Sequence, residues 1–136
     1  MTTEDGKASY EISTVVNIPF DDAVTKVTDE LKKEGFGVLT TIDVKATMKA
    51  KLDAEFERYV ILGACNPPSA KKVLDTDRAV GLLLPCNVVV QELGIDKTKV
   101  MTIDAEELFR LVVNLPEVTD VAKDIKDRLQ RVISTL

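Results

Sequence analysis

The two thiols of the chain, Cys65 and Cys86, are each followed by an asparagine, Asn66 and Asn87. A thiolate can act as a nucleophile, a metal ligand or a redox group, and an amide both donates and accepts hydrogen bonds. If the two segments meet in the folded chain, the sequence predicts a small polar site built from these four residues.

Cys65 is expected just before a helix, because Asn66 is a preferred helix cap and Pro67 a preferred first helical residue. The partial positive charge at that helix end would favour the thiolate, as a nucleophile or a sulfur carrier requires. The alternative is that Cys65 packs as a small buried side chain and that Asn66 only caps the helix.

Cys86 stands inside an apolar run, where a thiol has a raised pKa and low reactivity, so packing is its simpler role. Asn87 needs hydrogen-bond partners there. It either contributes to a polar pocket or satisfies backbone groups freed by Pro85. If the two strands are neighbours, the thiols could come within disulfide range, which requires Cα atoms about 4.4 to 6.8 Å apart.

Several classes of site lack an essential residue. The chain contains no histidine, which excludes a catalytic triad, a Cys-His dyad and the usual zinc sets. Two thiols alone do not fill four tetrahedral positions, so we expect no metal site. The sequence also lacks a Cys-x-x-Cys pair and a glycine-rich phosphate loop. It therefore identifies neither a reaction nor a cofactor.

The composition is that of a globular protein, with 136 residues, 45% of them apolar and 30% charged. We expect one domain over residues 9–136 after a flexible segment, residues 1–8. The net charge of -5 would repel a phosphate backbone, so nucleic acid is not an expected partner. The longest apolar run, residues 79–90, is too short to cross about 30 Å of hydrocarbon. Because the first residues do not form a secretion signal either, we expect a cytoplasmic protein without a membrane partner.

Hydrophobic periodicity predicts an α+β fold. Strands are expected over residues 10–18, 36–42, 56–64, 80–92 and 100–103, and helices over 19–33, 44–52, 67–77, 105–113 and 116–136. The strand over 80–92 is so apolar that we expect burial on both of its faces or in a subunit interface. Pro85 should mark a bulge or an edge of the sheet, because it cannot donate to a ladder.

Three segments resemble, in their order and separation, the bacterial and archaeal family called domain of unknown function 302. They are Gly37-Val-Leu-Thr-Thr-Ile-Asp-Val44, Ile61-Leu-Gly-Ala-Cys-Asn-Pro67 and Leu84-Pro-Cys-Asn-Val-Val-Val90. The resemblance covers roughly residues 10–136. The chain departs from the family pattern at Thr41, where an acidic residue is usual, and at Gln91, where an aromatic residue is common.

The resemblance implies a single domain with a β-α-β(4)-α-like plan and a mainly antiparallel sheet. Helices would pack on one face, with short helices inserted between the strands, in an architecture similar to the TATA-box-binding protein. The resemblance also implies frequent dimers. It implies no established reaction.

Three functional hypotheses follow. The first is a homodimer that binds a small ligand beside the Cys-Asn segments and Met48, which lies on the expected helix over 44–52. The second is a thiol-dependent sulfur-transfer or redox protein that uses Cys65, with Cys86 as resolving thiol and a sulfur compound as ligand. The third is a structural protein whose strand over residues 80–90 forms a subunit interface. We favour the first, because only Cys65 is a candidate for a group that titrates near neutral pH.

Overall fold

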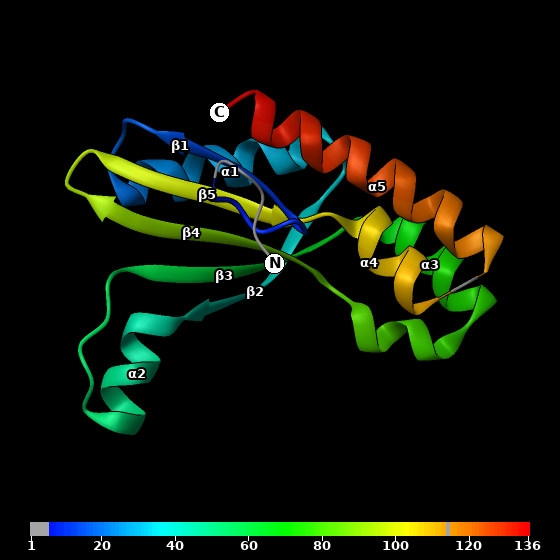
Figure 1. Cartoon of the computed structure of the whole chain (residues 1–136), viewed down its shortest axis with the longest axis horizontal. Coiled ribbons are helices and arrows are strands. Elements are labelled where there is room, and N and C mark those ends of the chain that lie inside the picture. Colours follow the sequence, from blue (N-terminus) through cyan, green and yellow to red (C-terminus); the bar gives the residue numbers. More distant parts are fainter. Residues whose placement is uncertain (1–5, 114) are drawn as a thin grey trace.

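The computed structural model of the chain describes residues 6–113 and 115–136. Five antiparallel strands form one sheet in the order β1-β5-β4-β3-β2 (Figure 1). The strands are β1 (Glu11–Val16), β2 (Gly37–Asp43), β3 (Tyr59–Cys65), β4 (Cys86–Gly94) and β5 (Lys97–Ile103). The α-helices are α1 (Phe20–Lys33), α2 (Val44–Leu52), α3 (Pro67–Thr76), α4 (Ala105–Val112) and α5 (Pro116–Ser134), and η1 (Arg78–Leu83) is a 3-10 helix. The predicted single α+β domain with inserted helices is confirmed.

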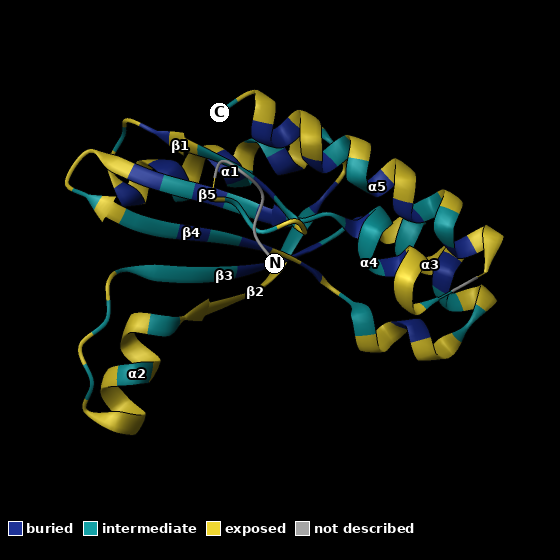
Figure 2. Ribbon diagram, viewed as in Figure 1, coloured by how far each residue is buried: buried dark blue, intermediate teal, exposed yellow. Residues whose placement is uncertain are grey.

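Helices α1 and α5 pack against one face of the sheet, where the main core lies. Each helix carries one apolar stripe, and Val27 of α1 and Leu129 of α5 are almost fully buried in it. The sheet contributes alternate residues, among them Val88 and Val90 of β4 and Val100 of β5. Figure 2 shows this alternation of buried and less buried residues along the strands. The other face of the sheet has no helix layer in the part of the chain that the structure describes.

The predicted strand over residues 80–92 is wrong in its first half. Asp77 caps η1 by accepting a hydrogen bond from the Ala79 amide at 3.0 Å, and the chain becomes extended again at Leu84, just before a cis Leu84–Pro85 bond. Strand β4 therefore begins at Cys86. Of the two predicted alternatives, burial on both faces within the chain is wrong, because Cys86, Val88 and Val90 are buried on the helix side, whereas Asn87 is exposed and Val89 only half-buried. Burial in a subunit interface stays a prediction.

A second, smaller core lies beyond the end of the sheet. It joins α3, η1, α4 and α5 through Val73, Val80, Phe109, Val118 and Ala122. Helix α4 starts where the Asp104 side chain accepts a hydrogen bond from the Glu107 amide at 3.0 Å. This cluster holds α4 and η1 so that they form a wall at one end of the open sheet face.

Helix α2 extends away from the sheet beyond the end of β2 (Figure 1). The Asp43 side chain caps it by accepting from the Ala46 amide at 2.9 Å, and Asp53, in the left-handed region, ends it. The helix predicted over 44–52 is thus confirmed. It contacts β2 and β3 and buries none of its own residues.

The expected flexible segment, residues 1–8, falls largely outside the described residues, which begin at residue 6. Within them, the Lys7 ammonium donates to the Ser13 carbonyl at 3.1 Å and the Ala8 amide to the Glu11 carboxylate at 2.6 Å. None of the helices described over residues 6–113 and 115–136 has the length and apolarity needed to cross a membrane.

Candidate ligand-binding site

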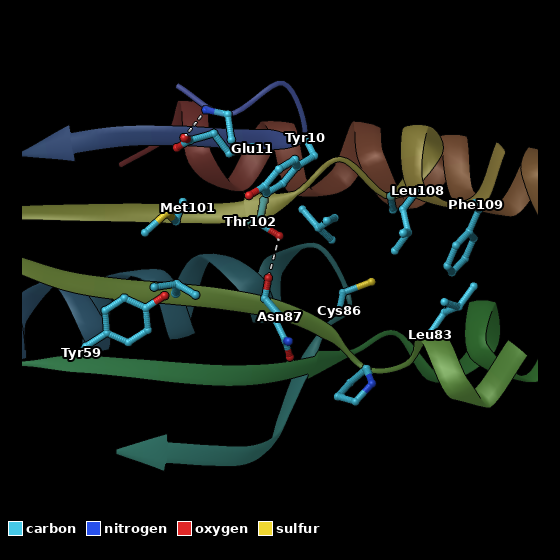
Figure 3. A pocket seen from close by; sticks show the side chains of 15 residues that line it. Tyr10, Glu11, Tyr59, Leu83, Cys86, Asn87, Met101, Thr102, Leu108 and Phe109 are labelled. Atoms are coloured by element: carbon cyan, nitrogen blue, oxygen red, sulfur yellow. Dashed lines mark hydrogen bonds between the residues drawn. The ribbon is translucent and has the colours of Figure 1, made fainter. Parts of the chain in front are cut away.

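The open face of the sheet is hollowed into a pocket of about 350 Å³. The floor of the pocket comes from β4 and β5. The ends of β1 and β3 and the wall of η1 and α4 complete the pocket (Figure 3). The lining residues are Ala8, Tyr10, Glu11, Tyr59, Leu83, Pro85, Cys86, Asn87, Val89, Met101, Thr102, Ile103, Ala105, Leu108 and Phe109. This volume lies at the lower end of the range of about 300 to 1,000 Å³ that is typical of small-molecule sites.

Strand register explains why the floor of the pocket is apolar. One row of paired residues crosses the whole sheet, from β2 to β1, on the face opposite α1 and α5: Ile42, Ile61, Val89, Met101 and Ser13. Four of these five residues are apolar, yet none of the five is buried. An apolar row left open on a sheet face can bind an apolar group without prior rearrangement.

Three polar side chains in the pocket have no partner among the described residues. The Asn87 amide and the hydroxyls of Tyr10 and Tyr59 make no hydrogen bond there, although the Asn87 carbonyl accepts one from the Thr102 hydroxyl at 3.1 Å. Burial, and then the negative charge of Glu57, raise the pKa of Tyr59. Its hydroxyl therefore keeps its proton at neutral pH and can donate to a ligand.

Glu11 is the charged residue of the pocket wall, and its charge is already compensated. Its carboxylate lies 2.9 Å from the Lys99 ammonium and accepts the Ala8 amide at 2.6 Å. Burial alone would raise the pKa of Glu11, but the hydrogen bond from the Ala8 amide and the charge of the neighbouring Lys99 ammonium outweigh it and lower the pKa. Glu11 is therefore ionised at neutral pH and held in place.

Cys86 lies between this pocket and a second, smaller cavity. That cavity has a volume of about 30 Å³ and shares Pro85, Cys86 and Phe109 with the open pocket. Burial, together with the nearby Cys65 thiol, raises the pKa of Cys86 to about 11. Cys86 is thus a neutral thiol at physiological pH.

Cys65 and Asn66 line the smaller cavity and not the open pocket. Cys65 is the half-buried last residue of β3, and both cysteines are free thiols. Asn66 caps α3 by accepting from the Ser69 amide at 3.2 Å, and its amide donates to the Glu34 carbonyl at 3.4 Å. The predicted capping role of Asn66 is confirmed. A cavity of this size has room for about one or two water molecules.

The five predicted site residues are thus divided among three places. Cys86 and Asn87 line the open pocket. Cys65 and Asn66 line the smaller cavity, which Cys86 also lines. Met48 is half-buried on α2 and lines neither. Over residues 6–113 and 115–136, no three His, Cys, Asp or Glu side chains gather closely enough to hold a metal ion.

The residues that depart from the family pattern lie outside the pocket. Thr41 is exposed on β2 opposite Leu62, and Gln91 pairs with Tyr59 and donates to the Glu57 carboxylate at 3.0 Å. Tyr10, Tyr59, Met101 and the wall formed by Leu83, Leu108 and Phe109 were not predicted as site residues from the sequence. Alternation along β3 and β5 could have placed Tyr59 and Met101 on the open face, whereas the wall depends on tertiary packing.

Fold and pocket together define a single-domain α+β protein with one open sheet face that carries a concave, largely apolar site. The model of the family described as Domain of unknown function DUF302 matches residues 12–136, so the chain belongs to the DUF302 family. It is similar to an uncharacterised conserved DUF302 protein from Bacillus stearothermophilus, known from a crystal structure, with 30% sequence identity and a TM-score of 0.83. The match covers 93% of this chain and 98% of that chain. Among curated proteins there is no match.

Proposed function

We propose that the protein binds a small molecule in the pocket on its open sheet face. The single observation that carries this proposal is an apolar hollow of about 350 Å³ whose lining includes three polar side chains without a hydrogen bond in the described structure, Asn87, Tyr10 and Tyr59. Polar groups that fix orientation within mainly apolar walls are the usual composition of a ligand site. The hollow includes Cys86 and Asn87, so the site lies beside one of the two Cys-Asn segments.

The chain offers a direct test, because it has no tryptophan and only two tyrosines, and both line the pocket. Protein labelled with 3-fluorotyrosine should give two fluorine NMR signals, which Tyr10→Phe and Tyr59→Phe assign. A panel of small aromatic compounds, neutral, anionic and cationic, is then titrated, and native mass spectrometry of the purified protein looks for a retained compound. A saturable shift of either signal supports the proposal.

Two matched variants test whether a compound binds in this pocket. Val89 is half-buried and lines the pocket, whereas Val15 is 46% exposed at the edge of the same face and does not. Val89→Trp should fill the hollow and abolish the shifts, and Val15→Trp should leave them unchanged. If no compound produces a saturable shift and none co-purifies, the proposal is overturned.

The apolar surface of β2 and α2 supports a homodimer as part of this proposal. Leu39, Ile42 and Leu52 are 66%, 49% and 71% exposed, and α2 buries none of its residues within its own chain. A second copy would remove this surface from water. Sedimentation velocity at micromolar concentration should show a dimer, and Ile42→Lys should dissociate it. A monomeric wild-type protein would refute the dimer and leave the ligand site untouched.

A second candidate function is thiol-dependent redox chemistry or sulfur transfer through Cys65. It is favoured by one observation: Cys65 and Cys86 line the same small cavity. Free thiols fit the reducing cytoplasm. With hydrogen peroxide as oxidant, the two thiols would give up two electrons and two protons to form a disulfide and two waters. Mass spectrometry after peroxide treatment should find this disulfide, and unchanged thiols would exclude the redox role.

A further inference from the structure

The charge of the pocket wall limits which ligands it can hold. Among the described lining residues, Glu11 is the only charged one, and Lys99 already neutralises it. An anionic ligand would find no free cation in the wall, and a cationic ligand would compete with Lys99 for Glu11. Because burying a charge without a partner is costly, the pocket favours an uncharged molecule.

The aromatic side chains limit the shape of the ligand. The chain has only two tyrosines and four phenylalanines, yet Tyr10, Tyr59 and Phe109 all line this pocket. They come from the start of β1, the start of β3 and helix α4, so aromatic rings reach the hollow from three elements (Figure 3). Rings in such positions stack on a planar ligand or contact it edge to face.

The pocket is also polarised from one end to the other. Figure 3 shows Leu83, Leu108 and Phe109 gathered at the end beyond the sheet, with the side chain of Asn87 nearer the centre and Tyr59 at the opposite end. An apolar group therefore fits the wall of η1 and α4, and a polar group fits the centre. Since a polar group without a partner is costly to bury, a ligand that meets the Asn87 amide gains orientation as well as affinity.

We propose that the pocket selects an uncharged aromatic molecule of one or two rings, whose hydrogen-bonding group meets the Asn87 amide and whose ring lies against Leu83, Leu108 and Phe109. This assignment rests on the proposed function of the same pocket. It adds the charge, the shape and the orientation of the ligand.

The test compares two probes that differ mainly in charge, 2-naphthol, which is neutral at pH 7, and 2-naphthoate, which is an anion. Dissociation constants are taken from the fluorine signals of the two labelled tyrosines. We expect 2-naphthol to bind at least about tenfold more tightly, because the carboxylate must be desolvated beside Glu11. If 2-naphthoate binds equally well or better, the ligand class is wrong but the pocket remains a binding site. If neither probe nor any compound of the panel binds, the proposed function itself fails.

The orientation is tested with two asparagine variants. Asn87 lines the pocket, and Asn17 is an exposed loop residue between β1 and α1 that does not. Asn87→Leu should lower the affinity for 2-naphthol about tenfold, because it removes one hydrogen bond to the ligand. Asn17→Leu should leave this affinity unchanged. Circular dichroism confirms that both variants fold. Unchanged affinity in folded Asn87→Leu overturns the role of Asn87.

Discussion

Asn87 of β4 lies directly opposite Gly63 of β3, and the missing side chain of Gly63 leaves the space that Pro85 occupies over the sheet. A Cβ atom at position 63 would lie 2.3 Å from the Thr40 hydroxyl and 2.9 Å from Cγ of Pro85. Gly63 thereby allows the segment that leads into β4 to cross close above β3. This crossing brings Pro85, Cys86 and Asn87 to the pocket.

Gly63→Ala should therefore destabilise the fold, by about 1 to 3 kcal/mol, as is typical of overpacking. Urea unfolding followed by circular dichroism measures the change. Gly37→Ala is the matched control, because a Cβ at that position meets no atom within 4 Å. Equal stabilities of the two variants would show that the close approach at Gly63 does not exist in solution.

The ion pair of Glu11 and Lys99 should make stability depend on pH in the acid range. The pKa of Glu11 is lowered in the folded protein from an ordinary value of 4.5. Its contribution is therefore fully present above that value and is lost as the pH falls through the lowered pKa. Glu11→Gln should cost about 1 to 3 kcal/mol at pH 7, because it leaves Lys99 without its partner, and clearly less at pH 3.

Urea unfolding at both pH values tests this dependence. The control is Glu55→Gln, since the side chain of Glu55 is 82% exposed and its pair with Lys49 contributes little. A cost for Glu11→Gln that is the same at pH 7 and pH 3 would contradict the assigned charge state.

Local sequence patterns predicted most of the fold. Caps and apolar periodicity identified α2, α3 and α5 closely, because Asn66 and Pro67 act on their own neighbourhood and the apolar stripe of α5 is long. The pattern failed where local chemistry was ambiguous. The leucines of η1 have the same composition as a buried strand, and only the Asp77 cap before them indicates that a helical turn starts there.

A bulge in β2 shows a second limit. Strict alternation along β2 would put Val38, Thr40 and Ile42 on the same side of the sheet, but the register shifts between Val38 and Thr40. Val38 therefore packs against the core, while Ile42 belongs to the open face.

The candidate site was less predictable than the fold. Cys86 and Asn87 could be predicted as site residues from the sequence because a thiol and an amide are residue types that can do chemistry. The wall opposite them comes from η1 and α4. Helix η1 ends at Leu83 and Asp104 caps the start of α4, so these two positions are 21 residues apart in the sequence. No local sequence pattern predicts that η1 and α4 lie side by side, because this long-range contact depends on how α3 and α5 pack. The division of the two Cys-Asn segments between two cavities has the same cause.

Cys86 should be nearly inert in the folded protein. A pKa raised from 9.0 to about 11 lowers the thiolate fraction near neutral pH about 100-fold. In a Cys65→Ala background, which leaves one thiol, iodoacetamide at pH 8 should modify Cys86 at least about 100-fold more slowly in the native protein than in urea. Mass spectrometry measures both rates, and similar rates would contradict the burial of this thiol.

The raised pKa of Cys86 also predicts that the folded protein loses stability at alkaline pH. Because the folded pKa is raised, the thiol of Cys86 stabilises the fold below pH 9 and loses that contribution as the pH rises from about 9 towards 11. Cys86→Ala should lack this part of the pH dependence. Parallel stability curves for wild type and Cys86→Ala over this range would contradict it.

Phe109 should act as the partition between the two cavities. Phe109 is 3% exposed and lines both the open pocket and the smaller cavity. Phe109→Leu should join them into one larger apolar space, at a cost of about 1 to 2 kcal/mol. Apolar cavities of this kind bind benzene, and a ligand that binds only the folded state raises the Tm. Benzene should therefore raise the Tm of Phe109→Leu more than that of Phe20→Leu, in which a buried ring that lines neither cavity is shortened. Equal responses of the two variants would mean that the Phe109 ring does not separate the cavities, and that Cys65 is not reached from the pocket by this route.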